Sequence, residues 1–193
     1  MYIPTQFAGR ILLCCAVLAA PAFALAQEAA PAKPAVGTQM TPAATYGKLL
    51  SAMEKEFVDA AEAMPEDKFN FAPATGEFKG VRSFGEQVKH VALANAFFFH
   101  DPTKPMDDMK TKQDAIGKLT TKADIIQALK GSFTQAHAYI DAITPENAFV
   151  MTANGTRGGM AAFGISHLMD HYGQMCVYLR MNGIVPPASR GSM

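Results

Sequence analysis

The chain has 193 residues with balanced charge, 17 lysines and arginines against 17 aspartates and glutamates. This balance gives no electrostatic reason to expect nucleic acid or an anionic membrane as a partner. Residues 1–26 hold Arg10, no acid and two of the 3 cysteines, so removing them leaves 17 − 1 = 16 basic and 17 acidic residues. Cys176 then stands alone, which excludes an intramolecular disulfide.

The first 26 residues have the pattern of a secretory signal peptide. Arg10 is the only charge in this segment, an apolar run follows at residues 11–20, and Ala-Leu-Ala at residues 24–26 forms a small-x-small cleavage pattern. The run is too short to cross a bilayer as a membrane helix. The pattern predicts a bacterial protein exported to the periplasm or secreted, with an uncleaved membrane anchor as the alternative.

The rest of the chain divides into three parts. Residues 27–40 are rich in alanine and proline, which predicts a flexible linker. Residues 41–187 carry helical periodicity and are predicted to form one folded domain, and residues 188–193 form a tail.

The first two predicted helices have clear start signals. The first begins at Thr41, an N-cap followed by proline, and stops at Pro65. After a loop, the second begins at Ser83, which forms a capping-box pattern with Glu86, and ends at Asp101.

Two more helices complete the domain. A polar segment up to Thr120 is predicted to be a loop without strands, and the third helix runs from Thr121 to a stop before Pro145. A glycine-rich loop at residues 154–159 precedes the fourth helix, predicted from about residue 160 to Met181. Four helices joined by loops predict an all-α protein, a four-helix bundle.

The strongest chemical signal is a pair of histidines four residues apart. His167 and His171 share one face of the fourth helix, so both imidazoles can reach one ion. Their neighbours on that face are largely apolar, and a buried histidine needs a partner. His90 on the second helix can supply a third ligand. The alternative is that His167 and His171 are two polar residues on a solvent-exposed helix face. For the pair alone, this alternative and a metal site are equally supported. Together with His90, the pattern favours one divalent metal ion.

Each of the other polar residues near these positions has two possible roles, one at the metal site and one in ordinary helix packing or capping. Glu86 and Asp170 are candidates to orient an imidazole, although the capping box already explains Glu86 and Asp170 fits a solvated position. Gln174 and Tyr178 continue the histidine face and either line a pocket or pack in the bundle. The remaining candidates, His100, His137 and Cys176, have no matching ligand partners, and Cys176 is predicted to be a small buried residue.

Two segments resemble the DinB-like (DinB/YfiT) family of metal-dependent proteins. The His-Leu-Met-Asp-His-Tyr-Gly-Gln run that begins at His167 resembles the family's last helix. The Ser-Phe-Gly-Glu-Gln-Val-Lys-His run that ends at His90 resembles its second helix. The resemblance extends over residues 41–187, and it departs from the family where Val81 and Arg82 replace the usual aromatic residue.

The resemblance implies an up-down-down-up four-helix bundle with one zinc, nickel or similar ion at His90, His167 and His171. Some family members are thiol transferases or maleylpyruvate isomerases, and dimers are common. The main hypothesis is therefore an exported metal-dependent hydrolase or transferase acting on an unidentified small molecule. A non-catalytic metal-binding or stress-related bundle is the alternative, and a metal-free binding protein is a third option. No nucleic-acid partner and no stable membrane insertion after signal cleavage are expected.

Overall fold

The computed structural model describes residues 33–106 and 108–191. The predicted signal peptide and the first part of the predicted linker, residues 27–32, lie outside the described residues. Residues 33–38 belong to an N-terminal unit distinct from the unit Gln39–Met193, and they contain a turn at Gly37 but no helix or strand. No helix within the described ranges has the length and apolar character needed to cross a membrane.

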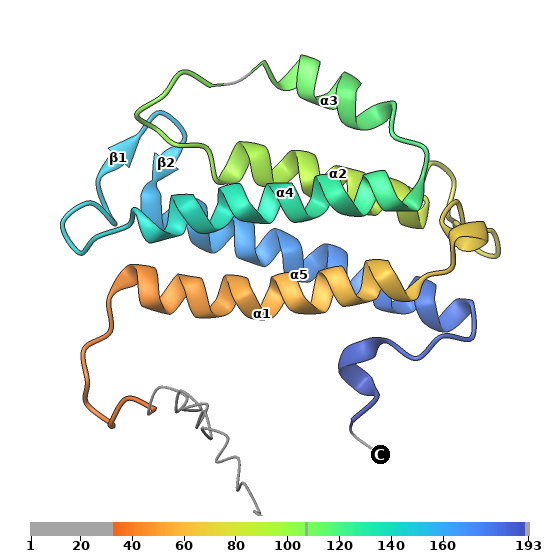
Figure 1. The fold of residues 1–193 in the computed structure, drawn as a ribbon, viewed down its shortest axis with the longest axis horizontal. Coiled ribbons are helices and arrows are strands. Elements are labelled where there is room, and N and C mark those ends of the chain that lie inside the picture. Colours follow the sequence, from red (N-terminus) through yellow and green to blue (C-terminus); the bar gives the residue numbers. More distant parts are fainter. Residues whose placement is uncertain (1–32, 107, 192–193) are drawn as a thin grey trace, which may run out of the picture. The chain divides into compact units, whose positions relative to one another are not determined.

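The unit Gln39–Met193 is mostly helical (Figure 1). Its α-helices are α1 (Pro42–Ala63), α2 (Phe84–Phe98), α3 (Met109–Gly117), α4 (Lys122–Asp141) and α5 (Arg157–Met181). Two short 3-10 helices, η1 (Glu66–Lys68) and η2 (Pro187–Ser189), follow α1 and α5. Strands β1 (Met151–Thr152) and β2 (Gly155–Thr156) pair antiparallel in a small hairpin.

Side-chain caps start the helices where the sequence predicted them. The Thr41 hydroxyl accepts a hydrogen bond from the backbone N–H of Ala44 at 3.1 Å. Ser83 and Glu86 form the complete capping box, with the Glu86 carboxylate accepting from the Ser83 N–H at 2.7 Å. The Thr121 hydroxyl caps α4 by accepting from the Asp124 N–H at 3.1 Å. Each cap satisfies N–H groups that the helix itself leaves without partners.

The predicted loop between the second and third long helices is wrong in part, because it contains α3. Asp108 caps this helix by accepting from the Lys110 N–H at 3.0 Å. No residue of α3 is buried, so the hydrophobic periodicity that marks a core-facing helix is absent from its sequence.

The glycine-rich loop is also shorter than predicted. Residues 154–156 form the turn and second strand of the β1–β2 hairpin, and α5 begins at Arg157, with Thr156 as its N-cap. The N–H of Gly158 donates to the Ala148 carbonyl at 2.7 Å, and a side chain at Gly158 would lie 3.1 Å from the same oxygen. Glycine here permits a close backbone approach inside a helix, whereas the sequence pattern indicated a loop.

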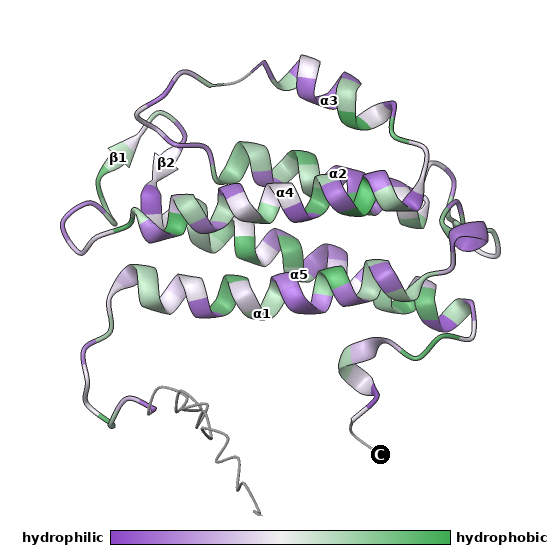
Figure 2. Ribbon diagram, in the orientation of Figure 1, coloured by the Kyte–Doolittle hydropathy of each residue, from purple (hydrophilic) through white to green (hydrophobic). Residues whose placement is uncertain are grey.

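The four long helices pack against one another, with α2 on α4, α1 on α5, α1 on α4, and α2 on α5. The shorter α3 packs on α2 and lies outside the others (Figure 1). Because three helices cover α2, most of its residues are hydrophobic, whereas α1 and α4 carry hydrophilic residues along their length (Figure 2). The fully buried large side chains of the core are Leu50, Phe57, Met64, Phe84, Phe99, Leu129, Phe133, Ile140, Ile143, Leu168, Met175 and Leu179.

A glycine in α5 tests how tightly this helix packs on α2. A Cβ at Gly164 would lie 2.6 Å from Cζ of Phe99 and 3.1 Å from Cβ of Phe98. We expect Gly164→Ala to lower the free energy of unfolding by about 1–3 kcal/mol through overpacking, measured by urea titration.

The matched control is Gly173→Ala in the same helix, where a Cβ meets nothing within 4 Å. Alanine there should raise stability by about 0.5–1 kcal/mol through helix propensity. Equal effects of the two substitutions would contradict the tight contact at Gly164.

Candidate metal site

The three predicted histidines meet at the contact between α2 and α5. Nε2 of His167 lies 3.2 Å from Nε2 of His90 and 3.1 Å from Nε2 of His171. Their ligand atoms all lie within 4.8 Å of one another, and the cluster contains no carboxylate or thiol among the described residues. His171 is 6 % exposed, and the other two are half-buried. The structure thus brings together all three residues that the sequence singled out.

The spacing of the nitrogen atoms fits a metal site. With metal–nitrogen bonds of 2.0–2.1 Å, two ligands of a tetrahedral ion lie about 3.3 Å apart. The observed separations of 3.1 and 3.2 Å are close to this value. A bound cation would accept a lone pair from each of the three nitrogen atoms.

A glutamine orients the buried histidine. Nδ1 of His171 lies 2.7 Å from Oε1 of Gln87, and Nε2 of Gln87 donates to Oε1 of Gln174 at 2.9 Å. With the Gln87 oxygen as acceptor, His171 carries its proton on Nδ1, so its Nε2 lone pair is free for a metal. Nδ1 of His167 is buried without a hydrogen-bond partner among the described residues.

The surroundings keep the imidazoles neutral. Burial, followed by the positive charge of Arg82 and the neighbouring His167, lowers the pKa of His90 to about 4. Burial, followed by the neighbouring His167 and His90, lowers the pKa of His171 to about 4. The pKa of His167 is also lowered, chiefly by burial, against the opposing charge of Asp170. Neutral imidazoles are the form that binds metal.

The two carboxylates considered from the sequence do not orient an imidazole. Glu86 is engaged in the capping box, and Asp170 is exposed and accepts from Nε2 of Gln174 at 3.3 Å. Gln87 takes that role instead. The sequence did not single it out, because its burial depends on how α2 faces α5. The only signal in the sequence was that Gln87 is a polar residue three positions before His90.

The remaining sequence candidates lie apart from the cluster. His100 lies with Nε2 2.9 Å from the Lys104 carbonyl oxygen, and His137 lies with Nε2 2.7 Å from a carboxylate oxygen of Glu54. Neither joins the three-histidine group. Cys176 is half-buried, so the prediction of a buried residue is only partly right.

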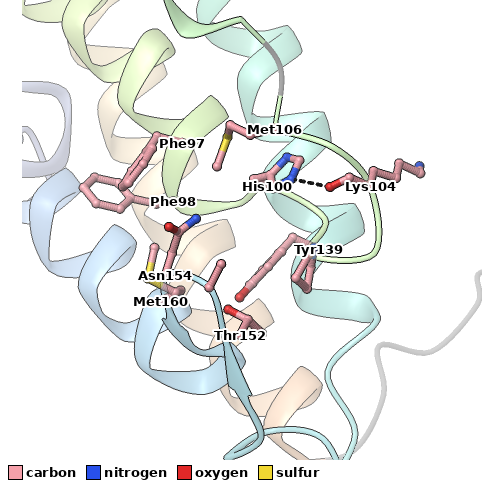
Figure 3. A pocket seen from close by; sticks show the side chains of 11 residues that line it. Phe97, Phe98, His100, Lys104, Met106, Tyr139, Thr152, Asn154 and Met160 are labelled. Atoms are coloured by element: carbon pink, nitrogen blue, oxygen red, sulfur yellow. Dashed lines mark hydrogen bonds between the residues drawn. The ribbon is translucent and has the colours of Figure 1, made fainter.

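An aromatic cluster borders the histidines on one side. The Phe98 ring centroid lies 5.1 Å from that of His167, 5.2 Å from that of Phe163 and 5.4 Å from that of Phe97. Phe97 and Phe98 also line a cavity of about 330 Å³ together with Met160 and Tyr139 (Figure 3). Phe98 therefore lies between the histidine cluster and this cavity.

Fold and site together describe a helical protein with a three-histidine candidate metal centre between two of its helices. The profile of the DinB superfamily matches residues 49–175. This range includes all three histidines, and the chain belongs to the DinB superfamily. The comparison with curated proteins found no match.

Replacing Gln87 tests how the site is oriented. We expect Gln87→Leu to lower the affinity for Zn²⁺ by about 10–100-fold, because His171 loses the acceptor that fixes its ring. Isothermal titration of the metal-free protein measures the affinity. Gln135→Leu is the control, since Nε2 of Gln135 bonds only the carbonyls of Ala96 and Phe99. An unchanged affinity in Gln87→Leu would remove Gln87 from the site.

The lowered histidine pKa values predict a pH dependence of stability. Between about pH 4 and 6.5 the unfolded chain binds more protons than the folded one, so stability of the metal-free protein falls as the pH falls. We expect the urea midpoint to drop between pH 7 and pH 4.5, and to drop less in His171→Gln. Gln135→Leu, which removes no titratable group, should keep the wild-type slope. Equal slopes in all three proteins would contradict the burial of a neutral His171.

Proposed function

We propose that this protein is an exported, DinB-like metal-binding enzyme, a hydrolase or transferase that holds one divalent ion through His90, His167 and His171. The convergence of three Nε2 atoms at 3.1 and 3.2 Å is the observation that supports this proposal most directly. Zinc and nickel both suit a set of imidazole ligands.

Three protein ligands leave one coordination position for water or substrate, which is typical of catalytic rather than structural sites. An ion held there supplies a Lewis acid that activates water or a thiol near neutral pH. The chain's own residues bind the ion, orient its ligands and cover one side of the site. His90 and His171 stay neutral as ligands, Gln87 holds the ring of His171, and Phe98 shields one side of His167 from water.

The finer features of the proposal follow from the sequence. We propose that the four long helices form the up-down-down-up bundle of the family. After cleavage of residues 1–26 the protein acts in the periplasm or outside the cell on a small molecule, without binding nucleic acid or inserting stably in a membrane. The homodimer implied by the family resemblance remains part of this proposal.

A non-catalytic metal-binding role is the second candidate, and one observation favours it. The cluster contains no carboxylate among the described residues, and the two acids nearest in sequence, Glu86 and Asp170, are engaged in helix-capping or surface hydrogen bonds. No general base beside the ion is therefore evident from the geometry.

Metal content tests the proposal. We expect the mature protein, purified without chelator, to hold close to one Zn²⁺ or Ni²⁺ per chain by elemental analysis, and alanine at any one of the three histidines to abolish or strongly weaken binding. His100→Ala and His137→Ala are matched controls that should keep the metal.

Activity separates the two candidates. The metal-loaded protein is assayed for ester hydrolysis and for thiol transfer, beside the His167→Ala variant. Turnover that requires the metal and is lost in His167→Ala supports the enzyme. Bound metal without turnover supports the non-catalytic role, and absence of metal uptake would contradict both.

A further inference from the structure

Arg82 lies two residues before α2, the helix that carries His90. Its backbone is fixed against α5, because the Tyr178 hydroxyl donates to the Arg82 carbonyl at 3.0 Å. Tyr178 is itself buried, and its ring packs edge-on against that of Phe71, with 5.8 Å between the ring centroids. Arg82 is thus anchored at the same α2–α5 contact that holds the three histidines, eight residues before His90.

The Arg82 side chain is available to a ligand. The residue is exposed, and its guanidinium makes no hydrogen bond or ion pair with any residue in the described ranges. The hydrogen bond from Tyr178 holds the Arg82 backbone against the helix that carries His167 and His171. From there the Arg82 charge acts on all three histidines and lowers their pKa values. An arginine without a protein partner beside a metal site is suited to bind an anionic group in a fork-like geometry.

The opposite side of the histidine cluster is aromatic. Phe98 lies eight residues after His90, about 12 Å further along α2. Its ring contacts His167, and its neighbours Phe97 and Phe163 are 39 % and 59 % exposed. Figure 3 shows the rings of Phe97 and Phe98 close together at one edge of the cavity. Exposed rings gathered next to a polar site indicate contact with an apolar ligand group.

The acids near the site do not cancel this charge. Glu86 accepts a hydrogen bond from the Ser83 N–H, and Asp170 accepts one from Gln174. A divalent ion and Arg82 together carry more positive charge than these two carboxylates carry negative charge. With the metal bound, the site therefore favours a ligand with negative charge.

We infer that the site takes an apolar organic anion, whose acid group binds Arg82 and the open position of the metal and whose apolar body lies on Phe97, Phe98 and Phe163. This inference rests on the proposed metal function and names the substrate class of that site. It predicts that small inorganic or short-chain anions bind more weakly than anions with an apolar body.

The test uses the full mature protein loaded with Co²⁺, whose visible absorption changes when a ligand enters its coordination sphere. The probes are 3-phenylpropanoate, acetate and 3-phenylpropan-1-ol. We expect 3-phenylpropanoate to bind most tightly. Arg82→Gln should weaken it by about tenfold or more, and Arg82→Lys, which keeps the charge but not the fork, should weaken it less. Co²⁺ itself should bind Arg82→Gln at least as tightly, because a positive charge is removed.

Two matched controls accompany these variants. Lys89→Gln removes another cation of α2, one residue from His90, whose ammonium instead donates to the Gly117 carbonyl at 3.1 Å. It should leave anion binding unchanged. Phe163→Ala should weaken 3-phenylpropanoate but not acetate, whereas Met169→Ala, equally exposed on α5, should affect neither.

The outcomes separate this inference from the proposed function. Bound Co²⁺ with equal 3-phenylpropanoate affinity in wild type and Arg82→Gln overturns the inference alone. Acetate binding as tightly as 3-phenylpropanoate also overturns it, by removing the apolar subsite. A protein that takes up no Co²⁺ overturns the proposed function, and the inference with it.

Discussion

The structure of the site depends on one constraint, the meeting of three imidazole nitrogens at the contact between α2 and α5. Burial lowers the pKa of all three imidazoles and so favours their neutral form, which is the form that binds a metal ion. Any change in the relative position of the two helices moves His90 away from His167. The close contact of Gly164 with Phe99 and the bond between Gln87 and His171 both act on this helix pair.

Two polar contacts near the cluster join α5 to α2 and to a residue shortly before α2. The Gln87–Gln174 pair ties α2 to α5 directly behind His171, at 2.9 Å, and the Tyr178 bond to the Arg82 carbonyl ties the same two helices at the start of α2. Buried polar contacts of this kind specify one register between helices, since a shifted register would leave each group without a partner. Along the chain, Arg82 and Phe98 lie on opposite sides of His90, eight residues before it and eight residues after it.

Much of the fold follows from local signals in the sequence. Thr41, Ser83 and Thr121 are capping residues, and a cap acts within four residues of its position, so the starts of α1, α2 and α4 could be predicted. The short exposed α3 and the glycines inside α5 could not. The helix α3 buries no residue. Gly158 and Gly164 are required by the close approach of the Ala148 carbonyl and of the Phe99 ring, which only the folded chain creates.

The sequence by itself determined the helical class, the caps and the three candidate ligands, because helical periodicity and the four-residue spacing of His167 and His171 are local properties. Only the tertiary structure decided that His90 joins them, that Gln87 rather than Glu86 or Asp170 orients the site, and that Arg82 and Phe98 border it. These relations join residues about 80 positions apart, and the packing of α2 on α5 alone brings them together.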